Sequence, residues 1–122
     1  MKKLLITLIL ISPFSFANWG DVYYCQMTTS SGISLEGKKT VYILEKFQFK
    51  LDKAKQAMVF GDKGYFSGTE GKLDPNKTWP DVESWYANSK YGLYAYIKGQ
   101  FAYTEVGIGS GITSITADCD KF

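Results

Sequence analysis

Aromatic side chains gather in one part of the chain, and their types and spacing favour binding chemistry. Six of them fall within 18 residues: Trp79, Trp85, Tyr86, Tyr91, Tyr94 and Tyr96. Aromatic rings stack on ligands and on one another, and tyrosine and tryptophan also hydrogen-bond. Three arrangements are open: an outer strip for a protein or sugar, the lining of a cavity, or packing in the core. We predict these six as the candidate ligand-binding residues.

The residue inventory removes most catalytic machinery. The chain has no histidine, and its 14 basic residues are all lysine. It therefore cannot build a histidine-based triad, an imidazole metal site or a bidentate arginine clamp. If Cys25 and Cys119 pair, no thiolate nucleophile and no cysteine-rich zinc site remains. We expect no catalytic residues, no metal ligands and no cofactor.

Two loops come near to known motifs without matching them. Gly107–Gly111 (G-I-G-S-G) lacks the lysine of a phosphate-binding loop, and isoleucines stand where a serine-hydrolase motif needs glycine. A hairpin turn explains it better. Asp74, Asp81 and Glu83 belong to an oxygen-rich stretch, but without EF-hand spacing they are better explained as solvated turn residues.

The only two cysteines lie near opposite ends of the chain. Alternation over Asp21–Thr29 puts Cys25 on the apolar face of a predicted strand, and alternation over Thr113–Asp120 does the same for Cys119. In an oxidising compartment we expect them to form a disulfide that joins the first strand to the last. Two free buried thiols are the alternative.

The chain between these two strands predicts further short strands separated by turns. They are Thr40–Asp52, Ala57–Phe60, Tyr65–Ser67, Val82–Asn88, Tyr91–Lys98 and Gln100–Val106. Val82–Asn88 would also fit one or two turns of helix. Gly68–Pro80 is predicted to be irregular. Seven or eight strands without a long helix predict an all-β fold, a single small antiparallel β barrel or sandwich. A disulfide between first and last strands favours the barrel, because closure removes exposed edges.

The first 17 residues have the layout of a secretory signal peptide. A basic pair precedes an apolar run at 4–11, and the segment ends in Ser15-Phe16-Ala17, with small residues at the −3 and −1 positions. That run is much shorter than the roughly 20 residues that span a membrane. We expect residues 1–17 to be cleaved and residues 18–122 to form one β domain in the periplasm or outside the cell.

Cleavage would leave the chain formally neutral. Lys2 and Lys3 account for the whole excess of 14 basic over 12 acidic residues. A nucleic-acid binder would be expected to carry a basic patch, and none is visible. We therefore predict no nucleic-acid partner, no stable membrane insertion after cleavage, and a monomer.

Three short motifs resemble an uncharacterised set of small exported β proteins of marine bacteria. They are Tyr23–Met27 (Y-Y-C-Q-M), Phe47–Lys50 (F-Q-F-K) and Thr116–Phe122 (T-A-D-C-D-K-F). The resemblance spans residues 18–122 and implies an exported β architecture, without implying a function.

Two better-known groups are similar in fewer respects. The early and late cysteines are similar to those of periplasmic lysozyme inhibitors, but the residue order in Gly64–Gly68 differs from the inhibitors' Ser-Gly loop. Asn18–Gly20 (N-W-G) is similar to the opening motif of lipocalin-like calycins, although its glycine follows the tryptophan. No functional residues carry over from either group.

These observations predict an exported, non-enzymatic binding protein for a small apolar or aromatic-stacking ligand, or for a cell-envelope partner. The alternative is a proteinaceous inhibitor of an extracytoplasmic hydrolase such as lysozyme. A cavity lined by inward tyrosines would favour ligand binding, whereas a protruding Gly68–Pro80 loop would favour inhibition.

Overall fold

The described part of the chain consists of β-strands joined by turns. A computed structural model describes residues 19–74, 82–107, 109 and 111–121. The strands are β1 (Val22–Ile33), β2 (Lys39–Val41), β3 (Lys46–Asp52), β4 (Ala57–Phe60), β5 (Glu70–Leu73), β6 (Ser84–Asn88), β7 (Gly92–Ile97), β8 (Gln100–Gly107) and β9 (Gly111–Lys121). The predicted signal peptide over residues 1–17 lies outside the described residues. The described residues include no helix that is long and apolar enough to cross a membrane.

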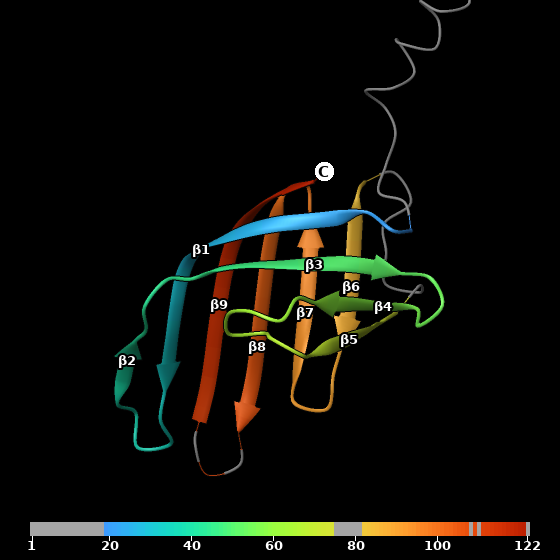
Figure 1. Ribbon diagram of the computed structural model, residues 1–122. Helices are drawn as coiled ribbons and strands as arrows, with labels where there is room; N and C mark the ends of the chain where they lie inside the picture. Colours follow the sequence, from blue (N-terminus) through green and yellow to red (C-terminus); the bar gives the residue numbers. More distant parts are fainter. Residues whose placement is uncertain (1–18, 75–81, 108, 110, 122) are drawn as a thin grey trace, which may run out of the picture.

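Eight of these strands close into an antiparallel barrel. Neighbours follow the order β1, β3, β4, β5, β6, β7, β8, β9, and β9 pairs back with β1. The short strand β2 is additional and pairs with the far end of β1 (Figure 1). The predicted all-β fold is thus confirmed, and of the two predicted architectures the chain adopts the barrel.

The seam between β1 and β9 is the longest strand pairing and contains the disulfide. Cys25 lies directly opposite Cys119, with their Cα atoms 4.0 Å apart, and the two sulfurs are bonded. Both side chains are buried. The predicted disulfide is confirmed, and it indicates a non-reducing environment.

A β-bulge divides β1 between two neighbours. The register with β9 shifts between Met27 and Thr29, where the Thr116 hydroxyl lies within 2.7 Å of the hydroxyls of both Thr28 and Thr29. A bulge bends its strand, so the first half of β1 runs beside β3 and the second half descends beside β2 (Figure 1). Odd-numbered residues face inward before the bulge and even-numbered residues after it. The strand predicted over Asp21–Thr29 therefore ends four residues too early, at the point where the alternation reverses.

The prediction of one long strand over Thr40–Asp52 is wrong. β2 ends at Val41 and β3 begins at Lys46. The residues between them, 42–45, pass from one half of β1 to the other, since β2 and β3 pair with different halves of that strand.

The predicted brief strand Tyr65–Ser67 is a turn. Backbone hydrogen bonds from Ser67 to Gly64 and from Thr69 to Phe66 close it tightly, at 3.1 and 3.0 Å. Within the stretch predicted as irregular, residues 70–73 form β5 and take part in the barrel wall.

Aromatic rings fill the barrel interior. Nine of them are no more than 6% exposed: Tyr23, Phe47, Phe49, Phe60, Phe66, Tyr94, Tyr96, Phe101 and Tyr103. Their contacts are mostly tilted or edge-to-face, with ring centroids between 4.7 and 6.4 Å apart. Phe66 belongs to the β4–β5 turn and enters the interior from one end. Tyr94 and Tyr96 therefore pack in the core.

Two glycines in the barrel wall make room for tyrosine rings. A Cβ added at Gly71 in β5 would lie 2.7 Å from the ring of Tyr94, and one added at Gly92 in β7 would lie 2.7 Å from the ring of Tyr103. Glycine normally weakens a strand. Here the tyrosine ring occupies the volume that a side chain would fill.

We predict that Gly71→Ala lowers the free energy of unfolding by about 1–3 kcal/mol, because the added methyl group overpacks a ring that cannot move freely. Urea denaturation measures the loss. Gly61→Ala is the matched control, since its Cβ meets the flexible side chain of Gln48, and we expect it to change stability by less than about 1 kcal/mol. Equal effects of the two substitutions would contradict the packing argument.

Candidate functional site: the two ends of the barrel

Each end of the barrel has one glutamate that accepts hydrogen bonds from two tyrosines. The closed end contains Glu83, the start of β1, the β7–β8 turn and the end of β9. The open end contains Glu105, the β1–β2 turn, the β6–β7 turn and the start of β9. Figure 1 shows the two ends at opposite sides of the barrel, with the C-terminus near the closed one.

At the closed end, Glu83 is fully engaged. Its Oε2 accepts hydrogen bonds from Tyr23 Oη and Lys121 Nζ, both at 3.1 Å, and its Oε1 accepts one from Tyr96 Oη at 3.4 Å. The Lys121 ammonium also lies 3.9 Å from Asp21. The glutamate that satisfies the two phenols therefore has its own counterion.

At the open end, Glu105 is only half engaged. Its Oε1 accepts hydrogen bonds from Tyr65 Oη at 2.6 Å and Tyr103 Oη at 3.0 Å. Its Oε2 accepts none from the described residues and is not buried. The ion pairs within the described chain join Lys55 to Glu70 and Lys121 to the closed end, so Glu105 has no lysine partner there.

The environment keeps four of these phenols protonated. Burial raises the pKa of Tyr96 to about 12, and the charge of Glu83 contributes to that increase. Burial and the same carboxylate raise the pKa of Tyr23 still further. At the open end, burial and the hydrogen bond to Glu105 raise the pKa values of Tyr65 and Tyr103 well above the usual range. All four therefore act as hydrogen-bond donors at neutral pH.

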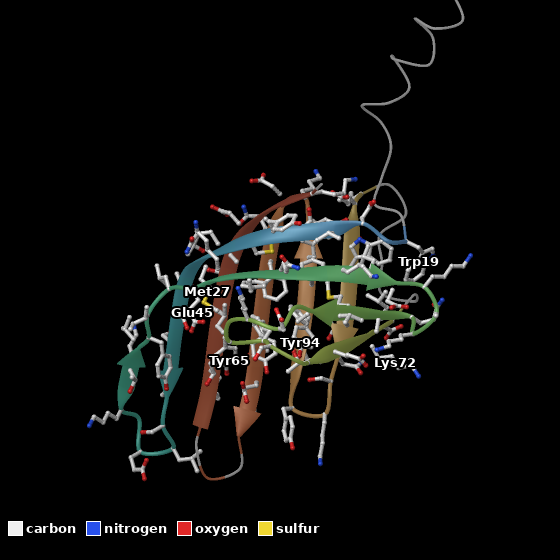
Figure 2. All side chains as sticks on the ribbon, viewed as in Figure 1. Trp19, Met27, Glu45, Tyr65, Lys72 and Tyr94 are labelled. Carbon is white, nitrogen blue, oxygen red and sulfur yellow. A yellow bond between two sulfur atoms is a disulfide. The ribbon has the colours of Figure 1, made fainter. Side chains whose placement is uncertain are left out.

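A pocket of about 520 Å³ lies at the open end. Its lining residues come from β1, β2, the 42–45 segment, the β4–β5 turn and β9: Ser30, Val41, Tyr42, Ile43, Glu45, Tyr65 and Thr113. Figure 2 shows Glu45 and Tyr65 on the same side of the barrel, near Met27. Thr113 lies opposite Glu105 across the β8–β9 ladder. The Glu105 carboxylate is therefore adjacent to the pocket through both Tyr65 and Thr113.

Backbone hydrogen bonds hold the lining segment 42–45 in place. The Tyr42 amide donates to the carbonyl of Ser30, and the Met27 amide donates to the carbonyl of Glu45, both at 2.9 Å. The Tyr42 ring lies over Gly32, where an added Cβ would be only 3.0 Å from the hydroxyl. The absence of a side chain at Gly32 thus lets the Tyr42 ring rest against β1.

The open end also gathers most of the exposed apolar surface. Ten of the 13 exposed large hydrophobic residues in the described chain lie there: Ile33, Leu35, Val41, Tyr42, Ile43, Leu44, Tyr65, Tyr91, Val106 and Ile112. Single exposed apolar residues are normal on protein surfaces, but their concentration in one region marks an interaction site.

A second hollow, of about 620 Å³, lies on the outer wall of the barrel. Its lining residues are Tyr24, Cys25, Gln26, Lys46, Phe47, Gln48, Gly61, Asp62, Lys63, Asp118 and Asp120. Two lysines offset two of the three aspartates there, and Asp118 accepts a hydrogen bond from Gln100. This composition is typical of a solvated strand face.

The structure does not gather the six predicted site residues into one site. Tyr94 and Tyr96 face the core, and Trp85 faces inward beside Tyr96 at the closed end, where its ring lies 5.7 Å from that of Trp19. The remaining three are separated from them. Tyr86 lies on the outer wall opposite Ala95, Tyr91 is exposed in the β6–β7 turn, and Trp79 lies outside the described residues.

Sequence reasoning missed the residues of the open end. Tyr42 and Glu45 were assigned to a continuous strand, and Tyr65 to a brief one. Glu105 did leave a signal, because it continues the inward alternation of Phe101 and Tyr103 with a carboxylate. A charged residue at an inward position of a strand suggests a polar function at that barrel end.

We predict that the four shielded tyrosines remain protonated well above pH 10. At most five of the nine tyrosines should ionise in the folded protein before about pH 12. A tyrosine whose pKa is raised by folding stabilises the folded protein below pH 10. This contribution to the free energy of unfolding is lost as the pH rises through the pKa of the folded state. Near-ultraviolet titration of phenolate, with circular dichroism to monitor folding, measures this. Ionisation of all nine near pH 10 in a folded protein would contradict it.

Comparison with known proteins identifies no relative. No family model, no curated protein and no solved structure matches this chain.

Proposed function

We propose that this protein is an exported, non-enzymatic binding protein that takes a small ligand with an apolar or aromatic portion at the open end of its barrel. One observation supports this most strongly: exposed apolar and aromatic side chains concentrate around a pocket of about 520 Å³ at that end. Burying such surface under a ligand contributes about 25 cal/mol per Å².

The interior of the barrel offers no support for a central ligand site. Its tyrosines pack against phenylalanines at 4.7–6.4 Å between ring centroids. A ligand site at a barrel mouth fits this arrangement better than one in the centre.

The other parts of the proposal rest on the sequence and the disulfide. The absence of histidine and arginine, and the pairing of both cysteines, support a non-enzymatic role. The disulfide, together with an N-terminal segment that has the layout of a signal peptide, supports a periplasmic or secreted location. Inhibition of a hydrolase remains the alternative prediction. The residues that would test it include 75–81, which lie outside the described chain.

Titration with nile red, a neutral dye whose fluorescence reports apolar surroundings, tests the site. We expect saturable binding to the wild-type protein. Ile43→Ser should weaken it about five-fold, since partial loss of an isoleucine contact costs about 1 kcal/mol.

Leu93→Ser is the matched control, because Leu93 is an exposed apolar residue that does not line the pocket. We expect this variant to bind the dye as the wild type does. Absence of saturable binding, or an equal loss in both variants, would contradict the proposed site.

A further inference from the structure

The charges of the two barrel ends differ in a way that the fold does not require. Both ends use a glutamate to accept hydrogen bonds from two tyrosine hydroxyls. At the closed end Lys121 neutralises Glu83 at 3.1 Å. At the open end Glu105 has no such partner among the described lysines, and its Oε2 accepts no hydrogen bond from the described residues.

The pocket beside Glu105 has a matching bias. It is lined by one acidic residue, Glu45, and by no basic residue. Two of its other lining residues, Tyr42 and Tyr65, are aromatic and carry no positive charge. The outer-wall hollow differs, because it contains two lysines beside its three aspartates. The open-end pocket thus combines aromatic walls with a carboxylate and has no lysine among its described lining residues.

We propose that the open end selects an organic cation, a small ligand with an ammonium group attached to an apolar body. This inference rests on the proposed function and names the class of ligand. The ammonium group pairs with the unused Oε2 of Glu105 and with Glu45. The apolar body lies against Tyr42, Tyr65 and Ile43.

Three physical terms favour such a ligand. An ammonium donor completes the hydrogen bonding of a carboxylate that already accepts two phenol hydrogens on its other oxygen. Aromatic rings attract cations through their negative faces. The phenols of Tyr65 and Tyr103 hold Glu105 in position, so its carboxylate does not have to be ordered when the ligand binds.

The test compares three probes with the same six-carbon chain: hexylammonium, hexanol and hexanoate. Chemical shifts of the backbone amides, followed by NMR during titration at neutral pH, give both affinity and location. We expect hexylammonium to bind about ten-fold more tightly than hexanol and hexanoate to bind most weakly. The largest shifts should belong to Ser30, Tyr42, Tyr65 and Thr113.

Glu105→Gln keeps an acceptor oxygen for both tyrosines but removes the charge. We expect this substitution to weaken the binding of hexylammonium about ten-fold and to leave the affinity for hexanol within about two-fold of the wild-type value. Glu36→Gln, which makes the same charge change in the exposed β1–β2 turn, should alter neither. If Glu105→Gln does not fold, Glu45→Gln replaces it with the same expected direction.

The outcomes separate this inference from the proposed function. Equal affinity for hexylammonium and hexanol at the open end would overturn the cation preference and leave the binding site standing. An equal loss in Glu105→Gln and Glu36→Gln would also overturn it, since net charge alone would then explain the effect. If none of the three probes shifts the amides of the open end, both proposals are overturned.

Discussion

The pairing of the first and last barrel strands is the constraint on which the rest of the structure depends. β1 and β9 come from opposite ends of the described chain. Their contact therefore requires the sheet between them to curve round until its last strand lies beside its first. The Cys25–Cys119 disulfide lies in this seam and closes a loop with a sequence separation of 94 residues. Chain-entropy reasoning gives such a crosslink at most about 4–5 kcal/mol of stabilisation. That is a large share of the stability of a domain of this size.

Closure explains both what the barrel interior contains and what its ends must do. The narrow interior is filled by aromatic rings, which bury a large apolar area. The tyrosines among them also bring hydroxyl groups that need hydrogen-bond acceptors. Tyr23 and Tyr96 reach Glu83 at the closed end, and Tyr65 and Tyr103 reach Glu105 at the open end. The open end differs because β1 turns away there to pair with β2. That departure leaves a pocket, exposed apolar residues and a carboxylate that has no lysine partner in the described part of the chain.

Much of the fold could be predicted from the sequence. Apolar and polar residues alternate regularly along a strand that keeps the same neighbour on each side over its whole length. β7, β8 and β9 were predicted almost to their ends for this reason. β1 was predicted only as far as its bulge, since the extra residue reverses the alternation. β5 was missed because Gly71 occupies its inward position, and the ring that fills the space comes from Tyr94, 23 residues later.

The candidate site was harder to predict because its residues share no sequence pattern. The aromatic-rich stretch from Trp79 to Tyr96 attracted attention by density, yet density follows from the needs of a small core as readily as from binding. Tyr42, Glu45 and Tyr65 come from irregular segments, where periodicity carries no information. Their proximity depends on how β1 bends and how the β4–β5 turn inserts Phe66, and neither can be read from local spacing.

The measurement that tests the central claim most directly is native-state hydrogen exchange along the seam. If β1 and β9 close the barrel, their facing amides between Cys25 and Cys119 should be among the most slowly exchanging in the protein, opening only near the global free energy of unfolding. The amides of β2, a fully exposed strand of three residues, should exchange much faster. Seam amides that exchange as fast as those of β2 would mean that the sheet is open between its first and last strands, and would contradict this account.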